Sequence, residues 1–88
     1  ERKTLMNAKD GVSYIVPQLI HYDNLEDKTE FFLRVQNEYK GVELVVKGDG
    51  QEIKRLKKRH MAPAEMEKVI LKKAELEAFN NITIEVIQ

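Results

Sequence analysis

The sequence predicts a small, mainly β protein that folds as a sandwich of two sheets. Segments rich in β-branched and aromatic residues recur about every 10 residues along the chain of 88, a spacing typical of sandwiches. One dipeptide, Asp49-Gly50, suits a two-residue type I′ hairpin loop, because both central positions of that loop take positive φ. We therefore expect one β-sandwich domain at residues 10–88, cut from a longer polypeptide, with residues 1–9 as a linker or poorly ordered arm.

The first strand is expected between Val12 and Ile20, at the edge of a sheet. Pro17 interrupts it with a bend or a bulge, because proline has no N–H to donate to a central ladder. A polar connection rich in turn formers follows at residues 22–28. The second strand, at residues 29–37, alternates apolar and polar side chains, so its buried face consists of Phe31, Leu33 and Val35.

The Asp49-Gly50 turn predicts the register of the hairpin around it. Closing a two-residue loop there pairs Lys47 with Glu52, so that opposite charges meet on one face. The next pair, on the other face, is Val46 with Ile53. We expect these two apolar side chains to be cross-strand neighbours in the core.

On the second arm of the hairpin the alternation fails. In simple register Arg55 would oppose Leu44, and Leu56 would point away from the core. An extra residue near Lys54-Arg55, a β-bulge, returns Leu56 to the core face opposite Leu44. We therefore expect a bulge at that point, or a switch of the strand to the second sheet.

Residues 63–79 carry two patterns that conflict. Pro63 suits a first helical position and the apolar residues after it are spaced as on one helix face, so propensity predicts a helix over 63–79. Such a helix would cover a small antiparallel sheet in an α+β fold. Residues 67–72 also fit a strand whose inward side chains are Val69 and Leu71. Periodicity alone leaves both the helix and the strand open for this segment. After it, a last strand is expected at 82–88.

Composition excludes several classes of function. Lys plus Arg equals Asp plus Glu at 15 each, so the net field attracts neither nucleic acid nor a membrane. The chain has no Cys, which removes disulfides, thiolate metal sites and thiol catalysis. No apolar run approaches the ~20 residues of a membrane span. From these features we expect a cytoplasmic protein.

From the sequence we assign no residue to catalysis, cofactor binding or metal binding. Ser13 has no His or Asp partner at a recognisable spacing, which argues against a hydrolase. His21 and His60 lack the i, i+4 or alternate-strand spacing of a metal pair, so we interpret both as ordinary surface or boundary side chains. We expect this fragment to bind no cofactor.

One cluster of positive charge lies between residues 54 and 59. This basic run has five cations in six positions: Lys54, Arg55, Lys57, Lys58 and Arg59. It could dock an acidic domain, a subunit or a phosphate backbone. Alternatively, it defends an edge strand against edge-to-edge pairing, with acidic side chains across from it. The run lacks the stacking aromatics that nucleic-acid sites usually interleave, so nucleic acid is not an expected partner.

Two stretches carry a resemblance to a known family. Residues 10–18, DGVSYIVPQ, and residues 57–67, KKRHMAPAEME, resemble the C-terminal tail of bacterial FAD/NAD(P)-dependent oxidoreductases of the pyridine nucleotide-disulfide type. The similarity also covers the segment FFLRVQNEYKGVELVVK between them. In that family a small β domain follows two nucleotide-binding domains, and the flavin and nicotinamide sites lie upstream on glycine-rich loops.

The resemblance implies a fold and a function. It implies an immunoglobulin-like β-sandwich in which residues 65–71 form a strand and only residues 74–79 are helical, and we adopt that fold over the long helix. It also implies a non-catalytic C-terminal accessory domain of an oxidoreductase whose FAD and NAD(P) bind elsewhere in the parent protein. The expected partners are the upstream flavin- and nucleotide-binding domains or partner subunits. The alternative is a free-standing module that docks an anionic partner on strand 54–59.

Overall fold

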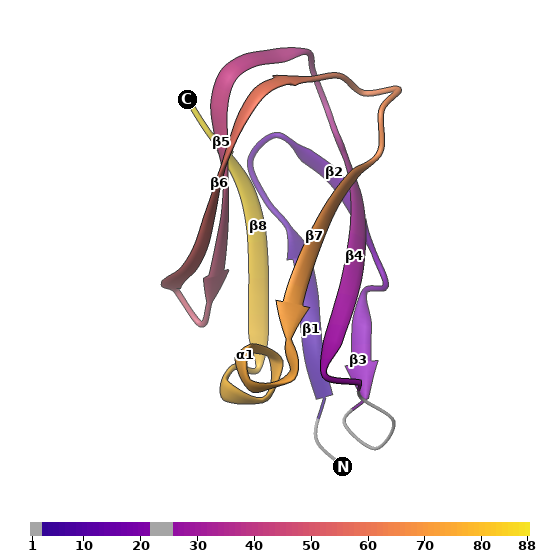
Figure 1. The fold of residues 1–88 in the computed structure, drawn as a ribbon, viewed down its shortest axis with the longest axis vertical. Coiled ribbons are helices and arrows are strands. Elements are labelled where there is room, and N and C mark those ends of the chain that lie inside the picture. Colours follow the sequence, from indigo (N-terminus) through magenta and orange to yellow (C-terminus); the bar gives the residue numbers. More distant parts are fainter. Residues whose placement is uncertain (1–2, 22–25) are drawn as a thin grey trace.

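Two β-sheets packed face to face form the protein, in a computed structural model that describes residues 3–21 and 26–88 (Figure 1). The larger sheet has the order β3 (Leu19–His21), β1 (Lys3–Ala8), β8 (Asn81–Ile87), β5 (Tyr39–Gly48) and β6 (Gln51–Met61). The smaller sheet has the order β2 (Val12–Val16), β4 (Lys28–Val35) and β7 (Glu67–Lys72), and the helix α1 (Lys73–Ala78) follows β7. The mainly β sandwich with one short helix is confirmed.

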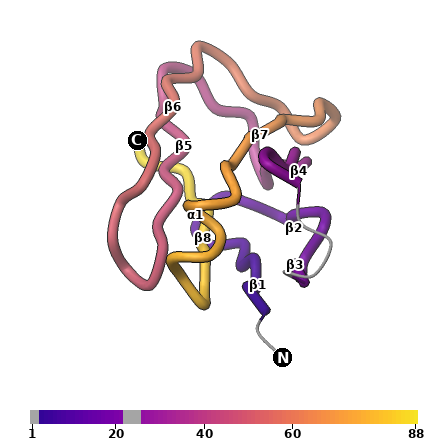
Figure 2. The backbone as a smooth tube through the Cα atoms, turned by 60° about the horizontal axis from the view of Figure 1, so that its bottom comes forward, coloured from indigo at the N-terminus to yellow at the C-terminus, as the bar shows by residue number. Residues whose placement is uncertain are grey.

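The core lies between the two sheets. On β4 the predicted side chains Phe31, Leu33 and Val35 are buried, because the strand alternates strictly between its two faces. β5 and β8 supply the facing residues of the larger sheet: Val42, Leu44, Val46, Ile82, Ile84 and Val86. Figure 2 shows β2 and β4 on one side of the molecule and β5 and β6 on the other.

The N-terminal segment is part of the larger sheet, so the prediction of a linker or arm at residues 1–9 is wrong for Lys3–Ala8. β1 lies between β3, to which it is antiparallel, and β8, to which it is parallel. Thr4 is fully buried, and its hydroxyl lies 2.9 Å from the carbonyl oxygens of Leu76 and Phe79, to which it donates. The partner strand β8 is at the far end of the sequence, so no local pattern indicates β1.

The first predicted strand divides at Pro17 between the two sheets. β2 is an edge strand of the smaller sheet and β3 an edge strand of the larger one. The Val16–Pro17 peptide bond between them is cis. The predicted edge position and the bend at Pro17 are both confirmed. The polar connection expected at 22–28 lies mostly outside the described residues, at 22–25.

The central hairpin forms at the predicted turn but with its bulge one residue earlier. Asp49 and Gly50 have φ of 46° and 90°, as a type I′ loop requires, and Leu44 pairs with Leu56 as expected. The ladder shifts between Val46 and Lys47, so Val46 pairs with Lys54 rather than with Ile53. The predicted Val46–Ile53 pair is therefore wrong. The bulged residue is Ile53, which packs partly buried against the core.

Residues 63–79 do not form the long helix of the alternative fold. β7 pairs along β4 in antiparallel register, which buries Val69 and Leu71, as the strand pattern predicts. Only six residues after it are helical. The Glu75 carboxylate accepts a hydrogen bond from the Lys72 N–H at 2.8 Å, so it caps the start of α1. Pairing with β4 therefore outweighs the helical propensity of this segment.

The end of α1 is held against the tip of the hairpin. Gly48 is buried at the end of β5, and a Cβ atom there would overlap the ring of Phe79. Glycine is needed at this position because the aromatic ring approaches the strand backbone directly. The Asp49 carboxylate accepts hydrogen bonds from the backbone N–H groups of Asn80 at 3.2 Å and Asn81 at 2.9 Å. The hairpin tip therefore fixes the turn that leads into β8.

Replacing Gly48 by Ala should destabilise the protein by about 1–3 kcal/mol, because the added methyl group displaces the Phe79 ring. Urea denaturation measures the loss, with Ser13→Ala on the exposed side of β2 as a control that costs less than about 0.5 kcal/mol. In the double variant Gly48→Ala/Phe79→Leu the loss should be smaller than the sum of the two single losses. If the two stability losses are strictly additive, contact with the Phe79 ring is not the cause of the loss in Gly48→Ala.

Candidate docking surface

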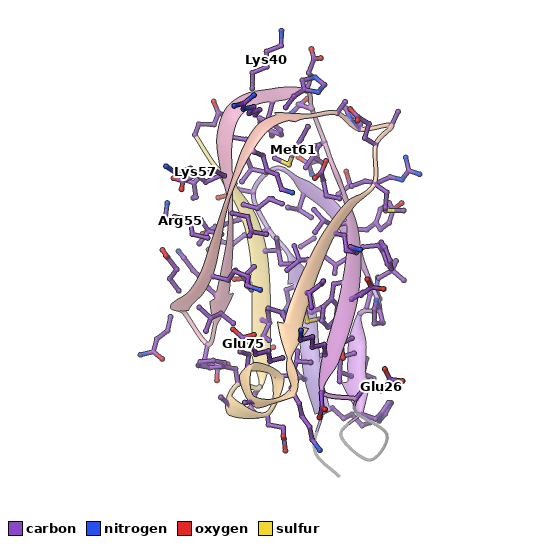
Figure 3. All side chains as sticks on the ribbon, in the orientation of Figure 1. Glu26, Lys40, Arg55, Lys57, Met61 and Glu75 are labelled. Carbon is purple, nitrogen blue, oxygen red and sulfur yellow. The ribbon has the colours of Figure 1, made fainter. Side chains whose placement is uncertain are left out.

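The basic run lies on β6, the outermost strand of the larger sheet. β6 pairs with β5 on one side, and in the described part of the chain its other side has no strand partner. Because side chains alternate along a strand, the run is divided between two faces. Lys54 and Lys58 lie on the core-facing side, opposite Val46 and Val42. The other three cations, Arg55, Lys57 and Arg59, lie on the outer side, and Figure 3 shows Arg55 and Lys57 pointing away from the core.

The two cations on the core-facing side connect the two sheets. Lys54 Nζ donates to the carbonyl oxygen of Ile70 at 2.7 Å, which occupies a backbone acceptor on β7. Lys58 Nζ lies 3.2 Å from Glu67 Oε1, also on β7. β6 and β7 are edge strands of different sheets, so these contacts close the open side of the sandwich between them. Lys54 and Lys58 thus have structural partners.

Arg55 is held by two carboxylates on the outer face. Its Nη2 and Nε lie 2.6 and 3.2 Å from the two carboxylate oxygens of Glu52, and its Nη1 lies 2.9 Å from Glu43 Oε1. The hydrogen bonds from Arg55 lower the pKa of the Glu52 carboxyl below its ordinary value, and the positive charges of Arg55 and Lys47 add to the effect. The same hydrogen bonds raise the pKa of Arg55. Arg55 is therefore already neutralised within the domain.

His60, at the end of the run, lies between two carboxylates. Its Nε2 is 2.8 Å from Glu38 Oε2, and its Nδ1 is 3.6 Å from Glu65 Oε1. His21 lies on β3, at the opposite edge of the larger sheet, so the two histidines are not brought together. Across residues 3–21 and 26–88, no group of three or more His, Cys, Asp or Glu side chains could hold a metal ion.

Lys57 and Arg59 are the two members of the basic run that form neither an ion pair nor a side-chain hydrogen bond with any described residue. Both are exposed, and both line a hollow of about 490 Å³ whose other walls are Gly41, Val42, Glu43 and Lys58. We call it the Gly41 hollow. Glu43 is the cross-strand neighbour of Lys57, but its carboxylate binds Arg55. Gly41 has φ of 62° and open space above its Cα, so backbone as well as cations is accessible there.

Elsewhere on the outer face, the charged side chains around the middle of β5 and β8 form ion pairs within the domain. Glu85 on β8 is buried, and its carboxylate lies 2.9 Å from Lys47 Nζ and 3.9 Å from Lys9 Nζ. Val45, between Glu85 and Arg55 in the ladder, is buried although it faces outward. The Gly41 hollow is thus the part of this face where cations from the basic run remain uncompensated.

Comparisons with known proteins add no assignment. No family model, curated protein or solved structure matches the chain. In the part of the chain that the structure describes, no helix has the length and apolar character needed to cross a membrane. What the domain does is therefore inferred from its own side chains and from the resemblance of its sequence.

The pKa of the Glu52 carboxyl should lie below its ordinary value, and Arg55→Gln should raise it toward that value, because the hydrogen bonds from Arg55 are the main cause. Carboxyl carbon NMR measures the pKa, with Lys57→Gln as a control of equal charge change. The pKa of Glu52 is lower in the folded protein than in the unfolded chain. The Glu52–Arg55 pair therefore stabilises the fold fully at pH values above the unfolded pKa, and this stabilisation is lost as the pH falls through the folded pKa. An unchanged Glu52 pKa in Arg55→Gln would contradict this assignment.

Proposed function

We propose that this domain is a non-catalytic accessory module that packs against other domains of an FAD/NAD(P)-dependent oxidoreductase. The family is suggested by the resemblance of residues 10–18 and 57–67. In the second of these segments, residues 57–61 end β6 and residues 62–66 form the loop toward β7. The loop is held in place by Arg34, whose Nη1 donates to the carbonyl oxygens of Pro63 and Ala64 at 3.2 and 2.9 Å.

The observation that carries the docking role is the pair of uncompensated cations beside the Gly41 hollow. Neighbouring cations of β6 already bind carboxylates or a carbonyl oxygen, so they have little left to offer a partner. Arg59 can bind a carboxylate through two parallel hydrogen bonds. Lys57, two residues earlier on the same face of β6, adds a second positive charge. An acidic surface on a neighbouring domain fits this arrangement, since complementary charges fix orientation and register.

The chemistry of the parent enzyme would reside outside this domain. FAD and NAD(P) require glycine-rich loops that cradle pyrophosphate, and this sequence has four glycines without a G-x-G-x-x-G pattern. Two of these glycines, Gly41 and Gly50, lie in the hairpin at positive φ, and Gly48 makes room for Phe79. Their roles in the fold are thus structural.

A second candidate is a free-standing module that takes an anionic ligand in the Gly41 hollow. The concave shape of that surface favours it, because an anionic group can enter the hollow beside Lys57 and Arg59. The two candidates differ in what precedes this domain in the native protein. A strand, glycine loop and helix upstream fit only the first.

The isolated domain should retain no FAD, whereas the native polypeptide should carry bound flavin. Gel filtration after incubation with FAD should give colourless domain, because the chain has no glycine-rich phosphate cradle. An antibody raised against the domain should isolate a longer, yellow protein from cells. A domain that keeps FAD at micromolar affinity, or a native protein without nucleotide-binding domains, would refute the proposal.

Lys57 should be shielded in the full-length protein. Acetylation of its amine should be at least about fivefold slower there than in the isolated domain, because a docked carboxylate surface covers it. Lys68 is an exposed lysine on the outer face of the smaller sheet, away from the Gly41 hollow, and should react equally in both proteins. Peptide mass spectrometry gives the rates. Equal reactivity of Lys57 in the two proteins would show that this surface does not dock.

A further inference from the structure

A second group of cations lies at the opposite end of the sandwich, where β7 passes into α1 (Figure 1). Lys28 at the start of β4 pairs directly with Lys72 at the end of β7. Both side chains lie on the outer face of the smaller sheet, since Thr29 and Leu71 beside them turn inward. Lys73 follows at the start of α1, and its N–H donates to the carbonyl oxygen of Asp27 at 2.9 Å. The backbone thus holds three cations, Lys28, Lys72 and Lys73, close together.

The Lys28–Lys72 pair is exceptional within the ladder. Among the cross-strand pairs of the described strands, it is the only one that places two Lys or Arg side chains, or two carboxylates, opposite each other. Elsewhere the ladder brings opposite charges together, as in Glu43 with Lys57. Directly opposed like charges lie about 5 Å apart at Cβ and destabilise a sheet. The sequence therefore accepts a repulsion here that it avoids elsewhere.

The described carboxylates near these lysines form no ion pair with them, although two of these carboxylates, Asp27 and Glu77, line the same hollow. None of Lys28, Lys72 and Lys73 forms an ion pair with a residue at 3–21 or 26–88. The Glu30 carboxylate binds Lys68 at 3.1 Å, and Glu75 accepts from the backbone of Lys72. The three lysines line one hollow of about 480 Å³, which we call the Lys72 hollow, together with Asp27, Ala74 and Glu77.

We propose that the Lys72 hollow binds a phosphate-bearing anion such as pyrophosphate. A tetrahedral group with several charges can accept hydrogen bonds from three ammonium groups on flexible stems, whereas a planar carboxylate suits an Arg fork better. The bound anion offsets the Lys28–Lys72 repulsion, so binding and stability are coupled. None of the lining residues is aromatic, so recognition is limited to the phosphate groups and does not extend to a base. The site is separate from the Gly41 hollow and does not depend on the proposed function.

Titration with sodium pyrophosphate at constant ionic strength, followed by ¹⁵N–¹H NMR of the whole domain, tests this site. The amide signals of Lys28, Lys72, Lys73 and Ala74 should shift and saturate with a Kd of about 1 mM. Lys72→Glu should weaken binding at least about tenfold. The same change should raise the Tm of the anion-free domain by about 2–5 °C, because an opposed pair of unlike charges replaces the repulsion.

Lys57→Glu is the matched control, with the same change of charge at the other hollow, and should alter the Kd less than about twofold. If Lys72→Glu does not fold, Lys73→Gln replaces it and should weaken binding about threefold with an unchanged spectrum elsewhere. Equal weakening by the Lys57 and Lys72 variants, shifts that do not saturate, or identical shifts with chloride would each overturn the proposal. A lower Tm for folded Lys72→Glu would show that no repulsion existed.

Discussion

The unequal width of the two sheets is the constraint on which the rest of the structure depends. In the described chain five strands face three, so the larger sheet extends beyond the smaller one at β6. The inner face of that strand cannot be covered by a facing strand, and it carries long cationic side chains around Leu56 instead of a continuous apolar row. Their aliphatic stems cover the core edge while Lys54 and Lys58 reach β7 with their charged ends.

The local features of the fold were predictable because each depends on residues close in the sequence. Asp49-Gly50 defines the turn, Pro17 the bend after the first edge strand, and the alternation around Phe31 the buried face of β4. β1 was not predictable, because the polar residue Thr4 is buried where its hydroxyl meets carbonyl oxygens far along the chain, those of Leu76 in α1 and of Phe79 just after it. The position of the bulge was predicted one residue too late. Either Ile53 or Lys54 can occupy the inward side of β6, because the aliphatic part of a lysine side chain can also cover the edge of the core.

For the candidate site, the sequence indicates where cations gather but not which of them are available. Alternation along β6 separates Lys54 and Lys58 from Arg55, Lys57 and Arg59, and this follows once the strand register is known. The carboxylates that neutralise Arg55 are near in sequence or across the hairpin, so that pairing could have been anticipated. The contacts of Lys54 and Lys58 with β7 could not, because they need the packing of the two sheets. The Lys28–Lys72 pair likewise exists only once β4 and β7 are in register.

The parallel pairing of β1 with β8 has a mechanical consequence. The chain enters β1 at one end of the molecule and leaves β8 near the other, while the two strands lie side by side in the larger sheet (Figure 1). A force that pulls the two ends apart therefore slides one strand along the other and loads all of their shared hydrogen bonds together. Strands peeled from one end would instead lose their bonds one at a time. The parallel ladder between β1 and β8 therefore resists such a force as a unit rather than bond by bond.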